Sequence, residues 1–218
     1  MPRLAILAAL CCLAAPALAE VELGFYGGWQ TAPHSDVSIE GDAIIPDQDF
    51  NAGWEGRSFE MPPHYGLRAT WWPDRFGGRL GFGIDANHAK VYADDETLDE
   101  SGLDRLEFSD GLNILTLNGM RRWPDAFGAV TPYVGAGVGV AIPRVEVEGA
   151  GSRTSEYQLT GPAVTLMAGA SVPIAENWSV FGEYKGTYSI NDADLDGGGT
   201  LEADVLTNAI NLGVSFSF

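Results

Sequence analysis

The chain has 218 residues and a formal net charge of −18. Such an acidic chain is a poor partner for nucleic acid and for anionic membrane surfaces, because like charges repel. Divalent cations fit this charge, and an acidic surface that only maintains solubility accounts for it equally well.

The first 19 residues have the pattern of a secretory signal peptide. Arg3 precedes an apolar run from Leu4 to Leu13, and small residues follow up to Ala19. The run is too short to span a bilayer, so we expect export and cleavage after Ala19. Both cysteines of the chain lie within this segment, which predicts that the mature protein has no disulfide bond.

Beyond Ala19 the dominant pattern is a two-residue alternation of apolar and polar or small residues, which is typical of β-strands. It is clearest at the C-terminus, where Ile210, Leu212, Val214, Phe216 and Phe218 alternate with Asn211, Gly213, Ser215 and Ser217. No later stretch is continuously apolar for the roughly 20 residues that a spanning helix needs. Eight strands are predicted, at about 21–30, 63–72, 79–92, 106–123, 131–147, 157–172, 178–190 and in the C-terminal segment ending at Phe218.

The predicted connections alternate between short and long. Those near 73–78, 124–130 and 173–177 are short, whereas those near 31–62, 93–105, 148–156 and 191–204 are long, and 31–62 has no clear period. Short periplasmic turns and long outer loops are typical of membrane barrels. A soluble lipocalin-like barrel is the alternative, but it does not require one short and one long end.

We therefore predict an all-β fold, a transmembrane antiparallel up-and-down β-barrel of about eight strands. The signal peptide takes residues 1–19, and the outer-membrane β-barrel domain takes residues 20–218. The final Phe218 is similar to the carboxy-terminal signal of outer-membrane barrels. This signal predicts a Gram-negative outer membrane location and the barrel assembly machinery as a partner during biogenesis.

The same alternation predicts which polar side chains face the barrel interior. They are His64, Arg68, Thr70, Asp85, Asn87, Glu183 and Lys185. An eight-stranded barrel is too narrow for a wide channel, so we expect these charges to neutralise one another, as the pairs Arg68–Asp85 and Glu183–Lys185. The facing of 106–123 stays open, because its leucine and isoleucine residues fall on both faces.

A candidate metal site lies near the C-terminus. Asp192, Asp194 and Asp196 alternate and are followed by glycine, which matches the first half of a calcium-binding loop. Glu202 comes one residue too early for the final ligand. A divalent-cation site formed by these four residues and a solvated acidic loop both remain open.

A second set of polar residues falls at the predicted outer ends of strands, level with lipid headgroups. The candidate catalytic residues are Glu60, His64, His88, Glu107 and Asp110. They could meet a sugar of lipopolysaccharide, whereas ordinary anchoring of loops explains each one individually. The three histidines have no zinc-binding spacing, and no nucleophile elbow is present.

Several segments resemble a known family of barrels. They are 53–63, 87–93, 106–113, 131–137, 181–188 and 207–214, beginning with Gly53-Trp54-Glu55-Gly56-Arg57 and Asn87-His88-Ala89-Lys90. They resemble the lipid A oxidases, small outer-membrane barrels of the OmpA type. The resemblance implies oxygen-dependent oxidation of the proximal glucosamine of lipid A to 2-aminogluconate, with lipopolysaccharide and outer-membrane lipid as partners of a monomer.

The resemblance leaves the enzyme's chemistry incomplete. It does not identify catalytic residues. The sequence has no motif for a redox cofactor, so the cofactor is unknown and a divalent cation is one candidate. Side chains alone are poor redox agents. The rival prediction is a non-enzymatic OmpA-like barrel with a structural or surface-interaction role, and a third is a small-solute pore.

Overall fold

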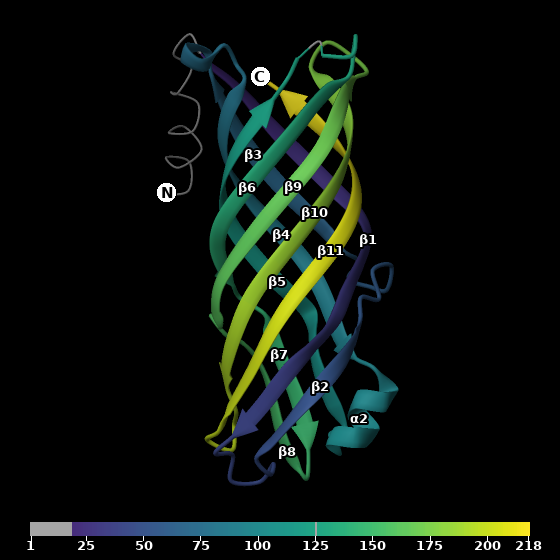
Figure 1. Cartoon of the computed structure of the whole chain (residues 1–218), viewed down its shortest axis with the longest axis vertical. Helices are drawn as coiled ribbons and strands as arrows, with labels where there is room; N and C mark the ends of the chain where they lie inside the picture. The colour runs from purple at the N-terminus through teal and green to yellow at the C-terminus, as the bar shows by residue number, and fades with distance from the viewer. Residues whose placement is uncertain (1–18, 125) are drawn as a thin grey trace, which may run out of the picture.

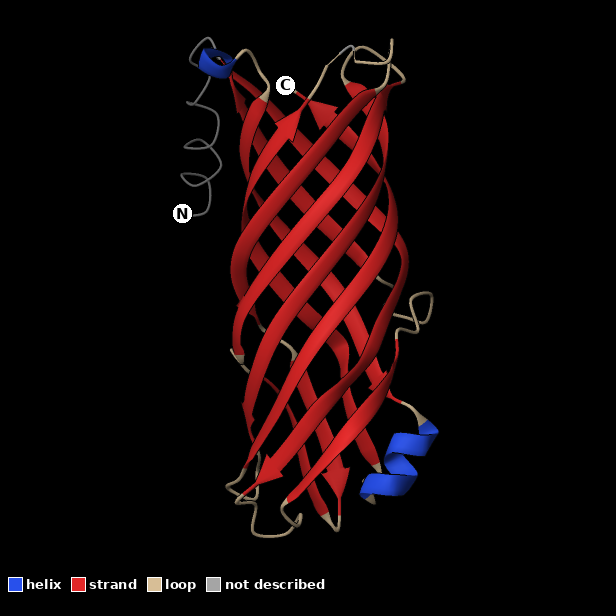
Figure 2. Cartoon of the chain, in the orientation of Figure 1, coloured by secondary structure: helices blue, strands red, loops and turns tan. Residues whose placement is uncertain are grey.

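The structure, a computed structural model, describes residues 19–124 and 126–218. Antiparallel strands dominate it, and eight of them close into a barrel (Figures 1 and 2). The ring contains, in order, β1 (Ala19–Glu40), β3 (Tyr65–Pro73), β4 (Leu80–Ala93), β5 (Arg105–Arg122), β6 (Thr131–Ala141), β9 (Gly161–Pro173), β10 (Trp178–Asp194) and β11 (Thr200–Ser217). Pairing of β11 with β1 closes the ring, which confirms the predicted fold class. The predicted signal peptide lies outside the described residues, apart from Ala19.

The two ends of the barrel differ. The turn end carries the short connections, including the 3₁₀ helix η2 (Asp74–Phe76), and the C-terminus (Figure 1). The opposite, extended end carries β2 (Gln48–Glu55), β7 (Arg144–Gly149), β8 (Ser152–Tyr157) and α2 (Asp95–Ser101). The prediction that 31–62 is a loop is therefore wrong in part, because β1 runs to Glu40 and β2 pairs with both β1 and β4.

The outer wall of the barrel is apolar over its middle. Side chains that point outward there are exposed, among them Phe25, Leu67, Trp71, Ile84, Leu117, Val138, Leu166, Val180, Leu212 and Val214. Trp178 and Tyr184 add aromatic rings to this band. Such a belt is what a membrane barrel presents to lipid. Among the described residues, no helix has the length and apolar character needed to cross a membrane.

A buried ion-pair network fills the interior of this middle section. Arg68 contacts Asp85 at 2.9 Å and both oxygens of Glu183 at 2.7 and 2.8 Å. Lys185 binds Asp85, and Tyr26 donates to Asp85 at 2.9 Å. The predicted Arg68–Asp85 pair is confirmed, whereas the predicted Glu183–Lys185 pair is wrong. Glu183 and Lys185 project side by side from β10, because they are two residues apart on one strand. Each instead contacts a partner across the bore, Glu183 with Arg68 and Lys185 with Asp85.

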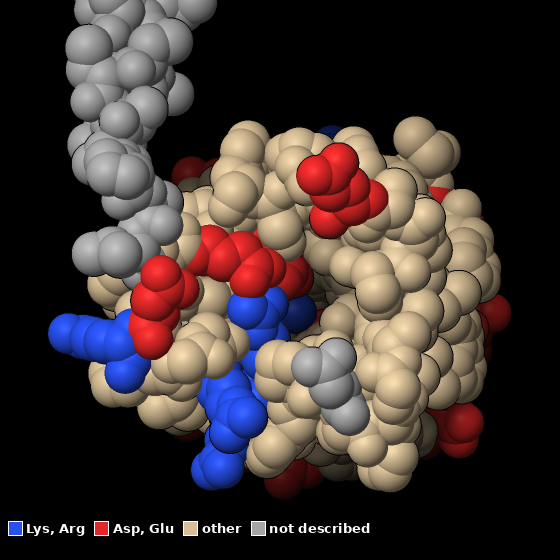
Figure 3. Space-filling view, turned by 90° about the horizontal axis from the view of Figure 1, so that it is seen from above, with Lys and Arg blue, Asp and Glu red and all other residues tan. Residues whose placement is uncertain are grey.

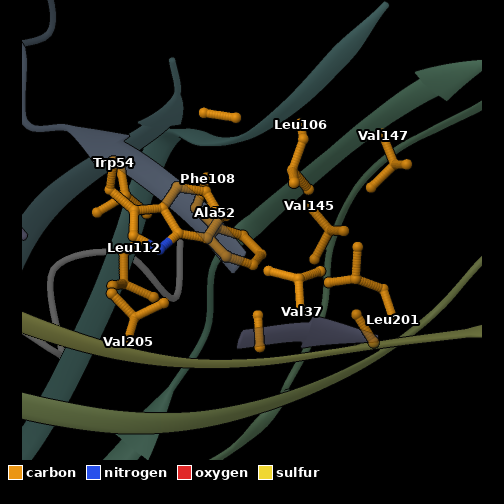
Figure 4. Packing of buried hydrophobic residues seen from close by; sticks show 14 of the residues in the cluster. Val37, Ala52, Trp54, Leu106, Phe108, Leu112, Val145, Val147, Leu201 and Val205 are labelled. Carbon is orange, nitrogen blue, oxygen red and sulfur yellow. The ribbon is translucent and has the colours of Figure 1, made fainter. Parts of the chain in front are cut away.

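Beyond this network, the interior at the extended end is apolar. The strand extensions enclose a cluster that includes Val37, Trp54, Leu106, Phe108, Leu112, Val145 and Leu201 (Figure 4). This change resolves the facing of β5. Leu112 and Ile114 point into the apolar cluster, Thr116 and Asn118 point into the polar section, and all four lie on the inner face.

Charged groups line the turn end. Figure 3 looks onto this end and shows acidic and basic side chains next to one another. Arg122 donates to Glu20 at 3.1 Å, and its guanidinium carbon lies 4.1 Å from the centre of the Trp72 ring. The bore therefore contains ion pairs at the turn end and in the middle, and apolar packing at the extended end.

Candidate functional site

The candidate site lies on the outer wall, where the apolar band ends at the extended end. Tyr65, His88 and Asn113 are neighbours across β3, β4 and β5, in one row of the ladder. Tyr65 and His88 stack with ring centres 5.0 Å apart, and Nδ1 of His88 lies 3.0 Å from Oδ1 of Asn113. We call Tyr65, His88, Lys90, Tyr92 and Asn113 the rim site.

The amide of Asn113 sets the tautomer of His88. Its Nδ2 donates to the carbonyl oxygens of Gly111 and Ile142, so its oxygen faces the imidazole and must accept. Nδ1 of His88 therefore carries a hydrogen. Nε2 is left with no hydrogen-bond partner among the described residues, although His88 is only 6% exposed. The rim site thus holds an enclosed lone pair that can accept a proton or a hydrogen bond.

Lys90 lies next on the same outward face of β4. It is fully buried, its ammonium group donates to the carbonyl oxygen of Glu60 at 3.0 Å, and it lies 5.2 Å from the Tyr92 ring centre. Arg57 covers the same ring at 4.5 Å. Burial, and after it the charge of Glu107, raises the pKa of Tyr92 to about 12, so the phenol keeps its proton at neutral pH.

Hydrogen bonds hold the segment that covers Lys90 against the barrel wall. The backbone N–H of Gln30 donates to the Ser58 hydroxyl at 2.8 Å, and the Gln30 side chain donates to the Lys90 carbonyl oxygen at 2.7 Å. The backbone of His64 donates to the Ser58 carbonyl oxygen at 2.8 Å. Glu60 is consequently placed above the rim site by its backbone, while its side chain is exposed.

A second group of charges lies farther out on β5 and β7. Arg105 Nη1 contacts Glu107 at 2.9 Å and Glu146 at 3.0 Å, and Arg144 contacts Asp110 at 2.6 Å and Glu146 at 2.9 Å. Glu107 and Glu146 are ladder partners on β5 and β7. Burial raises the pKa of Glu146, but a hydrogen bond from the protonated form of Glu107 and another from Arg105 outweigh it, so the net pKa is lowered. These five residues form the arginine–carboxylate cluster.

The structure separates the two histidines that the sequence placed together. His64 lies inside the barrel, with Nε2 3.0 Å from Oδ1 of Asn211 and Nδ1 3.1 Å from the His88 carbonyl oxygen. Tyr65 points outward beside His88, so the preceding residue points inward. His88 belongs to the rim site, and Glu60 contacts that site through its backbone. Glu107 and Asp110 belong to the arginine–carboxylate cluster.

The candidate calcium ligands do not converge. Asp192, Asp194 and Asp196 point outward and are exposed, and the residues between them, Ala193 and Leu195, enter the apolar cluster. Glu202 is the ladder partner of Asp192. Over 19–124 and 126–218, no group of three or more His, Cys, Asp or Glu side chains is placed to hold a metal ion. Strand alternation therefore explains the spacing of Asp192 and Asp194, and Asp196 lies in the turn that follows β10.

Sequence reasoning missed several residues of this region. Tyr65, Tyr92, Asn113, Arg57, Arg105 and Arg144 were not among the candidates. Sequence alternation carried part of this information, because it places Tyr65, Lys90 and Tyr92 on the outward faces of their strands. The ladder register was needed to place Asn113 beside His88, because the pattern along one strand does not tell which residue of the next strand lies opposite.

Comparisons with known proteins found similar solved structures and one matching family. The crystal structure of Neisserial surface protein A superposes with a TM-score of 0.52 and 14% identity, over 93% of this chain and 98% of that chain. The outer membrane protein OprG from Pseudomonas aeruginosa gives a TM-score of 0.49 and 13% identity, over 91% and 95%. At these identities the likeness concerns the fold alone, and no curated protein matches the chain. Residues 5–218 match the outer membrane protein beta-barrel domain family, so the chain belongs to that family of outer-membrane barrels.

Proposed function

We propose that this barrel is an enzyme that oxidises the proximal glucosamine of lipid A to 2-aminogluconate at the rim site. The observation that carries the proposal is the unpartnered Nε2 of His88, enclosed on the outer wall at the edge of the apolar band. Long connections of such barrels face outward, so the extended end faces the outside of the cell. A glycolipid headgroup in the outer leaflet would lie at this level.

Exposed guanidinium groups near the rim site could bind the phosphates of an anionic lipid. Four of the twelve lysine and arginine residues, namely Arg57, Lys90, Arg105 and Arg144, gather around the rim site and the arginine–carboxylate cluster. Carboxylates pair with all three of these guanidinium groups, so a phosphate would bind through guanidinium hydrogen bonds and not through a surplus of positive charge. The side chains of Arg57, Arg105 and Arg144 are 36%, 45% and 33% exposed, so they are accessible.

The chemistry assigns His88 one task. Oxidation of a C1 hemiacetal to a lactone removes a proton from oxygen and a hydride equivalent from carbon, and molecular oxygen accepts the two electrons to give hydrogen peroxide. Water then opens the lactone to the acid. Nε2 of His88 is suited to accept the hydroxyl proton, because Asn113 already occupies Nδ1. No side chain is assigned to the electron transfer, which needs a cofactor.

The rival is a non-enzymatic barrel that stabilises the envelope or displays its extended end. It has the same fold but requires no unpartnered imidazole. A pore is disfavoured by the ion pairs and the apolar cluster that fill the bore. The two remaining functions differ in whether lipid A changes chemically.

Mass spectrometry of lipid A from cells grown with oxygen, with and without the protein, tests the proposal. We expect a gain of one oxygen atom that is lost in His88→Asn, since asparagine keeps a donor near Nδ1 but has no atom at Nε2. His34→Asn, on an exposed part of β1, is the matched control and should retain the product. Identical lipid A with and without the protein, in a lipid that carries the glucosamine target, would favour the rival.

A further inference from the structure

A groove lies on the lipid-facing wall next to His88, on the side toward the turn end. Its volume is about 180 Å³, and its apolar lining includes Leu67, Ala86, Leu115 and Ile142. The ladder explains its shape, because Ala86 lies between Leu67 and Leu115 in one row across β3, β4 and β5. A small side chain between two leucines leaves a trough. We call it the Ala86 groove.

The Ala86 groove has a polar roof. The next row of the ladder, Tyr65, His88 and Asn113, closes its outer end. The imidazole is more than nine-tenths buried there, and its Nε2 has no partner among the described residues. Because Asn113 fixes the hydrogen on Nδ1, Nε2 of the neutral ring can only accept. An occupant whose polar end reaches Nε2 would therefore donate a hydrogen bond to it.

Two arginine residues come from segments that adjoin the groove or the rim site. Arg144 follows Ile142 of the groove by two residues, and Arg57 lies over the Tyr92 ring of the rim site. Both side chains are about one-third exposed. An occupant with an apolar chain, a hydrogen-bond donor at the head of that chain and phosphate beyond it would satisfy all three features.

We propose that the Ala86 groove holds one acyl chain of lipid A and that the amide N–H or hydroxyl group nearest the sugar donates to Nε2 of His88. This inference rests on the proposed function and names how its substrate binds. Diacyl phospholipids are the poorer occupants, because the ester groups at the heads of their chains only accept hydrogen bonds. The groove therefore favours a lipid that has a hydrogen-bond donor at the head of its acyl chain.

Native mass spectrometry of the full barrel in detergent, titrated with purified lipid A or with dioleoyl phosphatidylethanolamine, tests this inference. Ala86→Leu fills the groove and should weaken lipid A binding at least tenfold. Ala168→Leu, at an exposed outward position on β9, is the matched control and should bind as the parent does. His88→Asn should reduce lipid A binding and leave phosphatidylethanolamine binding unchanged.

The outcomes separate the inference from the proposed function. Lipid A binding that is the same in Ala86→Leu and in Ala168→Leu overturns the groove, even if cells still oxidise lipid A. Selective loss of binding in Ala86→Leu supports the groove, even if lipid A is never oxidised and the barrel only binds it. Heat-dependent gel mobility shows that each variant is folded before it is compared.

Discussion

Arg68 binds both carboxylate oxygens of Glu183 across the bore of the barrel, at 2.7 and 2.8 Å. Asp85 contacts the same guanidinium at Nε, so two acids and two bases, counting Lys185, neutralise one another inside the wall. None of the four side chains is exposed to lipid or to bulk water. The network joins the neighbouring strands β3 and β4 to β10 on the opposite side of the ring.

Removing one member of this network should destabilise the barrel. In Arg68→Met two carboxylates remain buried with a single cation, and breaking a buried pair in this way costs about 3–5 kcal/mol. The measurement is urea unfolding of the barrel in lipid vesicles. Arg121→Met, an exposed position at the turn end, is the control and should change the free energy of unfolding by less than about 1 kcal/mol. Equal unfolding midpoints for the two variants would contradict a stabilising network.

The hydrogen bond between Asn113 and His88 should set the tautomer of the imidazole. In Asn113→Leu the acceptor for Nδ1–H is lost, and we expect the proton to redistribute between the two ring nitrogens. Nitrogen-15 chemical shifts of labelled histidine measure this, and His34 serves as an internal control. If His88 is the proton acceptor, lipid A oxidation should fall about 10- to 100-fold, as loss of an orienting partner commonly causes. Unchanged shifts at His88 would show that Asn113 has no such role.

The apolar cluster at the extended end should fold as a unit that depends on Phe108. This ring is fully buried, and its centre lies 6.3 Å from that of Trp54. Phe108→Ala should weaken the extension by about 3–5 kcal/mol through lost burial and a cavity. Protease added to intact cells should then cleave the β7–β8 hairpin faster, while the membrane-embedded strands stay protected. Leu159→Ala, at an exposed position, should cleave at the parent's rate.

Much of this fold could be predicted from local pattern, because a membrane barrel imposes alternation on every strand. The inward positions of Arg68 and Asp85 follow from that rule alone. The apolar cluster could not be predicted in the same way. Where β5 leaves the membrane-spanning section, the barrel interior becomes apolar. Leu112 faces that interior and Leu115 faces outward, so both are apolar although they lie on opposite faces of the strand.

The site was less predictable than the fold, because it depends on register between strands. Glu183 and Lys185 look like a pair in sequence, yet each bonds across the bore. His64 and His88 look like a pair at one rim, yet the wall separates them. Asn113 carries no signal of its own until the ladder places it beside His88.

The arginine–carboxylate cluster should make the extended end sensitive to acid. The pKa of Glu146 is lowered in the folded state, so its contribution to stability is present above the ordinary pKa of a glutamate. That contribution is lost as the pH falls through the lowered value. Glu107, Arg105, Arg144 and the Ser155 hydroxyl face this carboxylate, and protonation would weaken its contacts with both arginines.

Protease protection of the β7–β8 hairpin, followed from neutral to acidic pH, measures this effect. We expect protection to decline with acid in the parent chain. In Glu146→Gln protection should be lower at neutral pH and vary less, because the titrating group is gone. Glu156→Gln, at an exposed position on β8, should follow the parent curve. A Glu146→Gln curve with the full acid response would mean that another carboxylate, such as Asp110 beside Arg144, governs the stability of this end.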